Sequence, residues 1–461
     1  MLNESIITEL QQIVGKDGVL STPEDLVSYS FDGTFAEHRP DVVVLPTTTE
    51  QVCQVMVLAS RERVPVVPRG MATGLAAASV PFGGGIALTL TRMNRILEID
   101  EENMTTTVEA GVITAALQKE VEKVGLFYPP DPSSIRQSVI AGNIACNAGG
   151  PRCLKYGITG DYVMGLTVVL ADGRVLKTGG KAIKNVVGYD MTSLFVGSEG
   201  TLGVITEALL RLTAKPKFAR TARAEFDDLG DASRTVNAVL TAGIVPATLE
   251  LMGQTAIACI EEAMQLGLPL DAEAMLLIEA DGSDEDAVVR EIESIARVCR
   301  ENGAREVSVA QDEDERASLW KARRSIAPSL ARRAPNKLGE DITIPRSAIP
   351  EAVRRIKEIS DQYGLPIVVF GHAGDGNLHP NILFDKRDPE QWAKVEPIVG
   401  ALFGLALELG GTLSGEHGVG TLKRPYMEQA LGAVSLEVQR GIKRAFDPLD
   451  ILNPGKVLPE Q

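Results

Sequence analysis

Three of the four histidines in the chain lie in two glycine-rich boxes near the end of the sequence. The first box reads GHAGDGNLH and contains His372 and His379, and the second reads GEHGVG and contains Glu416 and His417. Imidazole and carboxylate groups bind metal ions and carry protons, and glycine lets a backbone turn sharply or approach a ligand closely. The two boxes therefore predict a site for metal binding or proton transfer.

The sequence around the first box predicts how its side chains converge. Residues 377–384 have the period-two pattern of a strand, which places His379 and Asn381 on the same face. His372 lies on the preceding turn, close enough to join them. Two neutral imidazoles and one carboxylate, with Glu416 as the natural third ligand, suit zinc, iron(II) or manganese and leave positions open for a substrate.

The second box places two side chains that can do chemistry, Glu416 and His417, next to each other in the sequence. In an extended backbone Glu416 and His417 point to opposite sides, so one can bind metal while the other moves protons. A histidine beside a metal-bound hydroxyl is a sound general base. His38, in a polar loop next to Arg39 and Pro40, is expected to be structural.

Composition limits the classes of function that these boxes can serve. The chain of 461 residues is 44% apolar and 23% charged, as expected for a globular protein of two or three domains. It carries 46 basic and 62 acidic residues, a net charge of −16. This balance argues against nucleic acid and anionic membranes as partners. An anionic substrate would therefore need a local positive charge at the site.

The cysteines and the apolar segments argue against several other classes. Five cysteines without a CxxC pair predict neither a disulfide framework nor an iron–sulfur motif. The N-terminus has no basic start or long apolar run, so no signal peptide is expected. The most apolar stretch, Ile398–Leu407, is about half the length of a bilayer span. It is predicted to be a buried helix, and a transmembrane segment is not expected.

The site must be positioned by an ordered series of strands and helices. Residues 1–37 predict a helical lead-in, and residues 42–67 predict a strand, a capped helix and a second strand. Beyond a boundary near 215–217, strands and amphipathic helices alternate, and the segment 390–445 is mostly helical. The expected helices are 114–124, 231–242, 253–265, 284–303 and 350–363, and the expected strands include 275–280, 305–310, 341–345 and 366–370.

Two glycine-containing segments in the N-terminal half are candidates for phosphate binding. The turn Pro68–Gly74 follows a strand, and Gly142–Gly150 forms a second small-residue segment. Both offer backbone N–H groups to a phosphate. Neither has the GxGxxG spacing of a Rossmann site, and no Walker A motif occurs. The pattern favours a phosphate-bearing cofactor without naming it.

Taken together, these segments resemble the FAD-linked oxidoreductases with the vanillyl-alcohol-oxidase type fold. More narrowly, the chain is similar to the group of glycolate oxidase flavoprotein subunits, D-lactate dehydrogenases and D-2-hydroxyglutarate dehydrogenases. The matching segments are Pro68–Leu75, Pro129–Pro132, Gly142–Gly150, Lys155–Gly157, Ser198–Gly203, the two histidine boxes and Asp447–Lys456. The similarity covers nearly the whole chain from about residue 20.

The resemblance implies an α+β chain with a two-part FAD-binding domain. It also implies an α+β substrate or cap domain with an antiparallel sheet, and a helical C-terminal segment. The expected divisions are 1–37 (lead-in), 38–217 (FAD binding), 218–412 (substrate and metal cap) and 413–461 (C-terminal segment returning to the FAD domain).

Site roles also follow from the resemblance. His372, His379 and Glu416 would bind the divalent metal, with Asn381 nearby; His417 would be the general base; Arg323, with Lys337 as the weaker candidate, would bind the substrate carboxylate. The implied contacts of FAD are Arg69, Gly70, Thr73, Gly74, Leu75, Pro132, Ser138, Gly142, Asn143, Asn147, Gly150, Glu199, Gly203, Ile205 and Asn453. Within this set the segment from Glu199 to Ile205 would hold the adenosine end.

The chain departs from the group at the pyrophosphate turn. Met71–Ala72 and Ala76–Ala78 stand where glycines are common, which puts the flavin contacts of this turn in doubt. His38 is the one histidine of this half, so a histidyl link from the turn to the flavin is excluded. Cys146 is a remote candidate for a thioether, and non-covalent FAD is the expectation.

The implied reaction is oxidation of glycolate or a small (R)-2-hydroxy acid to the 2-keto acid, with 2-hydroxyglutarate as an alternative substrate. Electrons would pass to an iron–sulfur subunit with a second flavoprotein-like subunit, to an electron-transfer flavoprotein or to a quinone. The expected location is the cytoplasm, with peripheral attachment to the inner membrane through partners as a variant. A flavin-free metal-dependent hydrolase and a non-catalytic flavin-binding subunit are the alternatives of other classes.

Overall fold

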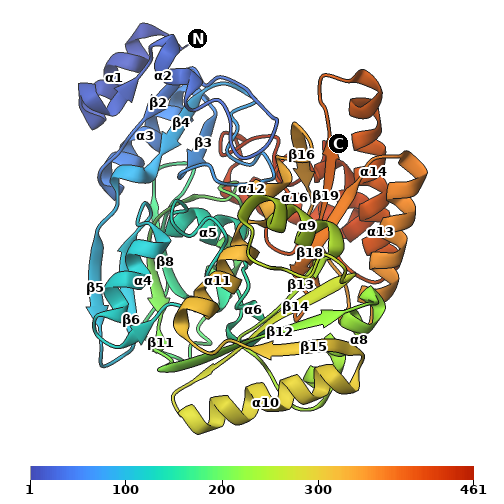
Figure 1. Cartoon of the computed structure of the whole chain (residues 1–461). Coiled ribbons are helices and arrows are strands. Elements are labelled where there is room, and N and C mark those ends of the chain that lie inside the picture. The colour runs from blue at the N-terminus through green and yellow to red at the C-terminus, as the bar shows by residue number, and fades with distance from the viewer. Residues whose placement is uncertain (1, 461) are drawn as a thin grey trace. The chain divides into compact units, whose positions relative to one another are not determined.

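The computed structural model describes residues 2–460, which form two compact units (Figure 1). Unit 1 consists of three stretches of the chain, Met1–Gly149, Ile158–Lys215 and Glu416–Gln461. Unit 2 consists of Gly150–Gly157 and Pro216–Gly415. The last stretch of unit 1 therefore follows the whole of unit 2 in the sequence.

The first part of unit 1 contains the strand–helix–strand expected near residue 42. Thr48 begins the helix by accepting a hydrogen bond from the Gln51 backbone N–H at 3.2 Å. The sheet has the order β1-β2-β4-β3, with β2 and β3 both parallel to β4 and β1 antiparallel to β2. Its elements are α1 Glu4–Val14, β1 Val19–Leu20, α2 Pro23–Val27, β2 Val42–Val44, α3 Thr49–Glu62, β3 Val66–Arg69 and β4 Ile86–Thr89.

The second part of unit 1 is an antiparallel sheet of order β5-β6-β10-β8-β9. The turn around Asp172 joins β8 and β9, which pair as an antiparallel hairpin. The elements are β5 Ile96–Asp100, β6 Thr105–Glu109, α4 Thr114–Glu122, β7 Leu126–Phe127, α5 Ile140–Cys146, β8 Val163–Val169, β9 Val175–Gly179, α7 Met191–Phe195, β10 Val204–Arg211, β11 Thr213–Ala214, α15 Met427–Leu431 and α16 Ala433–Phe446. Short 3-10 turns lie at Lys16–Gly18, Leu90–Arg92, Thr159–Tyr162, Arg346–Ala348 and Arg424–Tyr426.

Unit 2 is built on one antiparallel sheet of order β15-β12-β14-β13-β18-β19-β16, with β17 paired to β19. Its strands are β12 Phe218–Phe226, β13 Thr248–Gly253, β14 Ala274–Gly282, β15 Ala304–Val309, β16 Asn336–Gly339, β17 Ile342–Thr343, β18 Ile367–His372 and β19 Asn377–Phe384. Its helices are α6 Cys153–Tyr156, α8 Leu229–Thr241, α9 Gln254–Met264, α10 Glu285–Glu301, α11 Glu313–Arg324, α12 Ile326–Leu330, α13 Ile349–Tyr363 and α14 Pro389–Glu408.

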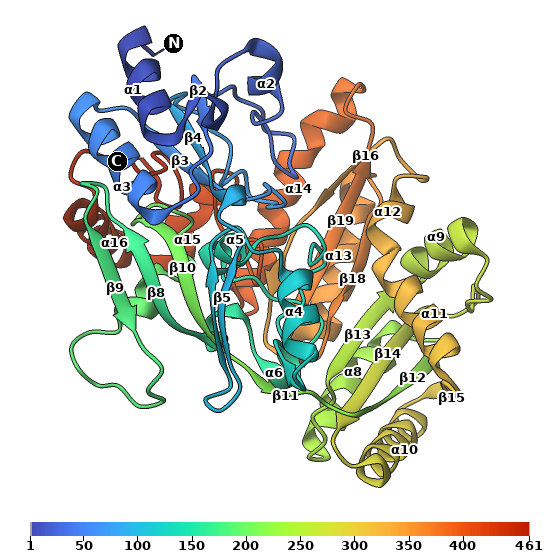
Figure 2. The ribbon, with the colours of Figure 1, turned by 90° about the vertical axis from the view of Figure 1, so that its left-hand side faces the viewer.

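Helices cover both faces of this sheet. Figure 2 shows α9 and α11 on one side of β13 and β14 and α8 on the other. The side that faces α9, α11 and α12 has an apolar core that includes Met252, Leu277, Trp320, Val368 and Phe370. This arrangement confirms the expected α+β class with an antiparallel sheet in the second half of the chain.

The apolar stretch Ile398–Leu407 lies inside α14, where Ile398, Leu402 and Phe403 are fully buried. The interpretation of this stretch as a core helix is therefore confirmed. Within residues 2–460, no helix has the length and the apolar character that crossing a membrane requires.

Candidate functional site

The two histidines of the first box are brought together by the hairpin of β18 and β19. The strands pair Phe370 with His379 and His372 with Asn377, so both histidines project from the same face. Their ring centroids lie 5.1 Å apart and the rings are nearly perpendicular, at 87°. Gly376 closes the hairpin in a left-handed conformation with φ +86°, and a Cβ there would lie 2.1 Å from a backbone oxygen.

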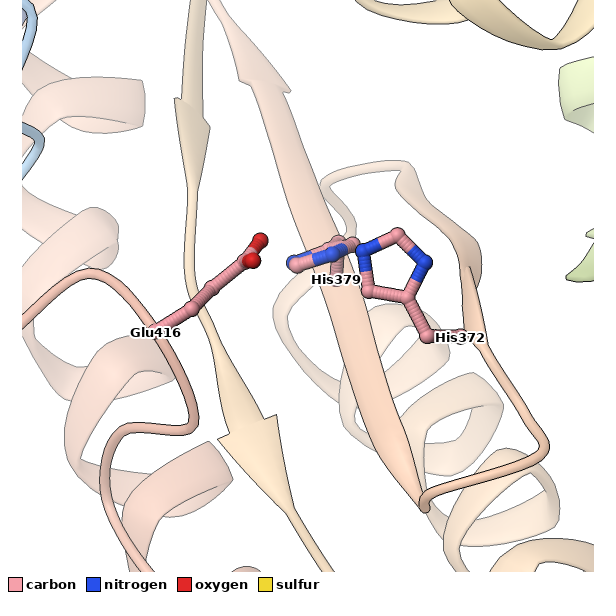
Figure 3. A group of neighbouring side chains, drawn as sticks. All are labelled: His372, His379 and Glu416. Atoms are coloured by element: carbon pink, nitrogen blue, oxygen red, sulfur yellow. The ribbon is translucent and has the colours of Figure 1, made fainter. Parts of the chain in front are cut away.

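Glu416 completes a group of three potential metal ligands (Figure 3). One ligand atom from each of His372, His379 and Glu416 lies within 4.8 Å of the other two. Glu416 directly follows the last residue of unit 2, and the two residues before it are anchored there. Asp341 accepts hydrogen bonds from the Ser414 hydroxyl at 2.7 Å and from the Gly415 backbone N–H at 3.0 Å.

The donor set of this group fits a divalent metal ion. Two imidazoles and one carboxylate are the usual donors for zinc or iron(II) with open coordination positions. His372 also has the supporting contact of such sites, because its Nδ1 lies 2.6 Å from the Glu250 carboxylate. This hydrogen bond makes Nε2 the ring atom of His372 that can coordinate.

Glu250 is the centre of a buried charged cluster that the sequence analysis missed. Its side chain is fully buried, and its Oε2 accepts a hydrogen bond from Arg323 Nε at 2.6 Å and forms an ion pair with Arg323 Nη2 at 2.5 Å. Burial alone would raise the pKa of Glu250, but the neighbouring Arg323 and His372 outweigh burial and hold that pKa below its usual range. Glu250 therefore remains an anion that orients His372.

Arg323 is consequently not a solvated helix charge. It is 7% exposed, and its guanidinium lies 5.1 Å from the centroid of the Phe370 ring. Its Nε and Nη2 atoms both contact Glu250. Nη1 is therefore the guanidinium nitrogen that does not contact this carboxylate. Lys337 on β16 is half-buried, and burial lowers its pKa. Within the described residues no carboxylate lies at ion-pair distance from Lys337.

The strand register gathers these groups on one face of the sheet of unit 2. Glu250 on β13 pairs with His372 on β18. Lys337 on β16 pairs with Leu383 on β19, and Leu383 lies on the same face of β19 as Asn381, two residues earlier. Directly paired residues and alternate residues along a strand share a face. The side chains on this face are Glu250, His372, His379, Asn381 and Lys337.

The second box departs from the expected opposite orientation of its neighbours. His417 Nε2 lies 3.8 Å from Glu416 Oε1, so the two side chains are close together. The reason is that the backbone here is a series of bends with a left-handed Gly418, rather than an extended strand. Both side chains can therefore act on the same ligand.

In unit 1, the loop after β3 is held in place by buried cations. Arg69 donates to the backbone oxygen of Ser79 at 3.4 Å, and Lys456 Nζ donates to those of Ala77 and Val80 at 2.8 and 2.7 Å. Burial lowers the pKa of Lys456 to about 8. The guanidinium of Arg69 thus supports this loop from within the protein.

The alanines that stand in place of glycines keep a glycine-like backbone. Ala72 has φ +52° and Ala77 has φ +60°, in the left-handed region that L-residues rarely adopt. Residues held in such conformations cluster at ligand sites when the surrounding structure enforces them. Ala72 and Ala77 therefore have backbone conformations that are more usual for glycine.

The loop of residues 71–75 fits a cofactor that contacts backbone. Gly74 has no atom within 4 Å of the position where a Cβ would stand, and Leu75 is 40% exposed. Behind the loop, Ser79 Oγ and Asn453 Oδ1 are buried, and neither makes a hydrogen bond within the described residues. The open space beside Gly74 would allow the pyrophosphate of FAD to approach the backbone of this loop.

The second glycine segment forms a short helix, α5, and most of its polar side chains bond within the protein. Asn143 Nδ2 donates to Thr114 Oγ1 at 2.7 Å, Ser138 Oγ lies 3.2 Å from the same hydroxyl, and Asn147 accepts from the Gly160 N–H at 2.8 Å. Gly142 has its nearest neighbour atom at 3.6 Å from a Cβ position, so its backbone is the approachable part of α5.

The remaining residues implied for FAD are mainly packed inside the protein. Gly203 lies against Val168, where a Cβ would come within 2.5 Å, and Ile205 is a buried residue of β10. Pro132 is buried, Thr73 is partly exposed, and Gly70 faces Val139. Cys146 has a pKa raised to about 12 by burial, which disfavours the thiolate that a thioether link would need.

Glu250 and Asp341 are the site residues that sequence reasoning did not identify. A usable signal existed for Glu250, because a single carboxylate interrupts the apolar strand TLELM. A buried charge in such a strand requires a partner. Asp341 had no comparable local signal, because its partners Ser414 and Gly415 are more than 70 residues away in the sequence.

Comparisons with known proteins bear on both units. Residues 40–179 match the family described as FAD binding domain, and residues 215–457 match the family described as FAD linked oxidases, C-terminal domain. The chain is 46% identical to glycolate oxidase subunit GlcD of Bacillus subtilis (strain 168), covering 99% of this chain and 97% of that protein. It is 35% identical to D-lactate dehydrogenase of Anaerostipes hadrus, covering 92% and 90%.

The fold is similar to that of solved structures with low sequence identity. The crystal structure of p-cresol methylhydroxylase with substrate bound matches with a TM-score of 0.81 at 19% identity, covering 98% of this chain and 96% of that one.

Proposed function

This chain belongs to the FAD-linked oxidase family and is an FAD-dependent oxidoreductase, and we propose that it oxidises a small 2-hydroxy acid of the glycolate or D-lactate type to the 2-keto acid. The observation that carries this proposal is the group of His372, His379 and Glu416 with cations on the same sheet face. A hydroxyl beside a carboxylate is a chelating unit for a metal held by such a group.

Each cofactor has one chemical task in the proposed reaction. Non-covalently bound FAD would supply the acceptor for the hydride from C2 of the substrate, and a divalent metal held by His372, His379 and Glu416 would supply the positive charge that lowers the pKa of the substrate hydroxyl. The residues of the chain bind, orient and move the proton. The products are the 2-keto acid, a proton and the two-electron-reduced cofactor.

We propose that His417 takes the hydroxyl proton at Nε2. Its position 3.8 Å from a Glu416 oxygen puts it beside the metal group. The adjacent glycines allow the backbone of the second box to bend, so that ligand and base lie together. Glu250 holds His372 in a single orientation, which leaves Nε2 as the ring nitrogen that would coordinate a metal.

The substrate carboxylate is assigned to Lys337 and to Nη1 of Arg323. Lys337 has no carboxylate partner within the described residues, and Arg323 keeps one donor edge after binding Glu250. Because Arg323 is already paired with an anion, the face has little charge to spare for a second carboxylate. This favours monocarboxylates over 2-hydroxyglutarate as substrates.

The decisive experiment is anaerobic reduction of the bound flavin by a panel of acids. Glycolate and D-lactate should bleach the flavin absorbance, D-2-hydroxyglutarate should bleach it more slowly, and chelator treatment should slow all three. Bleaching by none of them would contradict the proposed reaction, and bleaching unaffected by metal removal would contradict the role of the metal.

A matched pair of histidine variants sharpens the test. His379→Ala should lose metal and flavin reduction while keeping FAD, whereas His38→Ala, which changes the exposed histidine outside the boxes, should behave as the wild type. Equal losses in the two variants would remove the support for a metal site.

A partner protein or a quinone is proposed to take the electrons onward, because the chain has no cysteine motif for an iron–sulfur cluster. The Bacillus relative is named a subunit. The purified chain should reduce a dye or a quinone but not NAD, and rapid direct reduction of NAD would contradict this.

The alternative of a flavin-free hydrolase predicts a colourless protein, which membership of a family of FAD-linked oxidases disfavours.

A further inference from the structure

The carboxylate of Glu199 is bonded to the backbone immediately after the second histidine box. Its Oε1 accepts a hydrogen bond from the Val419 N–H at 2.6 Å, and its Oε2 accepts one from the Gly420 N–H at 2.7 Å. The residue is 5% exposed. Two short bonds from one buried carboxylate to consecutive N–H groups fix both the position and the orientation of that backbone.

Glu199 is itself held in an unusual conformation. Its φ is +51°, in the left-handed region, and its backbone oxygen accepts a hydrogen bond from Asn453 Nδ2 at 2.7 Å. The same amide nitrogen donates to the Ala78 oxygen at 2.9 Å. The backbone and the side chain of Glu199 are therefore both fixed by contacts inside unit 1.

The loop of the second box is shaped around this carboxylate. Gly418 has φ +85°, and a Cβ on it would stand 2.7 Å from Glu199 Oε1. Gly420 has φ +52°, and a Cβ there would stand 1.8 Å from the Ala76 oxygen. The two glycines of GVG are therefore required by the close approach of Glu199 and of the loop that contains Ala76.

We propose that Glu199 is a positioning residue that clamps the Val419–Gly420 backbone and thereby sets the place of Glu416 and His417. This inference rests on the proposed function for the roles of those two side chains, but the clamp itself is a contact within unit 1. It gives Glu199 a task different from binding the adenosine end of FAD, because both of its carboxylate oxygens are already taken by backbone N–H groups.

The direct test measures hydrogen exchange at the Val419 and Gly420 amides in the FAD-loaded chain. In Glu199→Gln a carboxamide has one acceptor oxygen, and its NH₂ group faces the second N–H, so one bond is lost. Exchange at these amides should be roughly 10-fold faster or more. The matched control is Glu109→Gln, which changes a buried carboxylate that accepts the Arg95 backbone N–H at 2.8 Å in the same unit.

Two further readouts separate positioning from loss of structure. The affinity for Zn²⁺, measured by calorimetry, should fall roughly 10-fold in Glu199→Gln, because one ligand is displaced while the bound FAD remains. With the preferred hydroxy acid, kcat should fall while KM changes little, because the proposed carboxylate-binding cations lie in unit 2. The Glu109→Gln control should keep wild-type values in all three measurements.

A second variant covers the case in which Glu199→Gln does not fold. Gly418→Ala keeps the Glu199 carboxylate but adds a Cβ 2.7 Å from Glu199 Oε1, so it should show the same faster exchange and weaker Zn²⁺ binding.

Unchanged exchange at Val419 and Gly420, or equal changes in the Glu109 control, would overturn the clamp. If the clamp is present but no 2-hydroxy acid bleaches the wild-type flavin, the proposed function fails and the clamp stands.

Discussion

Two buried glutamates, one in each unit, hold the two histidine boxes by different means. Glu250 in unit 2 is bonded to the charged or chargeable side chains Arg323 and His372. Glu199 in unit 1 is bonded to the backbone N–H groups of Val419 and Gly420. Both carboxylates are buried, so they differ in the kind of group that donates hydrogen bonds to them.

The difference appears in their pKa values. Around Glu250 the neighbouring charges outweigh burial and hold the pKa low, whereas around Glu199 burial outweighs two backbone hydrogen bonds and the charges of Lys423 and Lys456 and raises the pKa to about 7. The contacts of Glu250 with Arg323 and His372 thus stabilise its anion more than the neighbours of Glu199 stabilise the anion of Glu199. The first arrangement suits a permanent support for a metal ligand, and the second holds a loop.

The largest expected effect comes from removing the carboxylate of Glu250. In Glu250→Ala, Arg323 becomes a buried charge without its anion, and the free energy of unfolding should fall by about 3–5 kcal/mol. Denaturant unfolding of the whole chain measures this loss.

The control for this loss is the double change Glu250→Leu with Arg323→Met, which removes both charges and should recover most of the stability while abolishing activity. A loss below about 1 kcal/mol in Glu250→Ala would show that the cluster is not electrostatically coupled.

The second effect is a pH dependence that separates the two glutamates. The folded-state pKa of Glu199 is about 7 against an ordinary value of 4.5, so the folded chain binds this proton more tightly than the unfolded chain. The stability it contributes is fully present below about pH 4.5 and is lost as the pH rises towards 7.

Between pH 4.5 and 8, the wild type should therefore lose roughly 1–3 kcal/mol of unfolding free energy relative to Glu199→Gln. Unfolding curves at a series of pH values measure it. A difference that does not vary with pH would place the carboxylate in a more polar setting than its burial indicates.

A smaller effect is expected where Glu250 keeps its shape but loses its charge. Glu250→Gln can still accept the His372 hydrogen bond, so the chain should fold, but the affinity for Zn²⁺ should weaken about 10- to 100-fold. Calorimetric titration measures the change in affinity. The control is Glu279→Gln, because Glu279 is another buried carboxylate of unit 2 and accepts a hydrogen bond from Trp320 Nε1 at 2.7 Å. Wild-type affinity would mean that Glu250 supports the fold alone.

The smallest effect concerns the loop tied to the backbone of Glu199. Ala77→Gly relieves a left-handed alanine but adds freedom to the unfolded chain, so unfolding free energy should change by less than about 1 kcal/mol. Ala77→Val should be clearly destabilising, because a β-branched residue tolerates this conformation poorly. Equal stability of the two variants would contradict the observed backbone.

Local patterns predicted most of the fold. The period-two run of residues 377–384 and the amphipathic helices such as 285–301 follow from hydrophobic spacing, and both are present in the structure. The convergence of His372 and His379 also followed from spacing, because the two residues belong to one hairpin. The overall class and the family were predictable because glycine-rich segments occur along the whole chain.

What escaped prediction depends on contacts between distant parts of the chain. Glu250 lies 122 residues from His372, and Glu199 lies 220 residues from Val419, so no local pattern relates them. The opposite orientation of Glu416 and His417 was expected only for an extended backbone, and the second box is bent instead, because of glycine conformations that the residue types permit but do not dictate.

The three-part make-up of unit 1 has a consequence for its synthesis. The loop that contains Ala77 is held by Lys456, which lies 379 residues later in the chain. At about 5–20 residues per second, a ribosome needs roughly 20–75 s to make that stretch. This loop therefore lacks its contacts with Lys456 while unit 2 is being synthesised. A nascent chain that has not yet reached residue 456 lacks this lysine, so the loop gains this contact only after unit 2 has been synthesised.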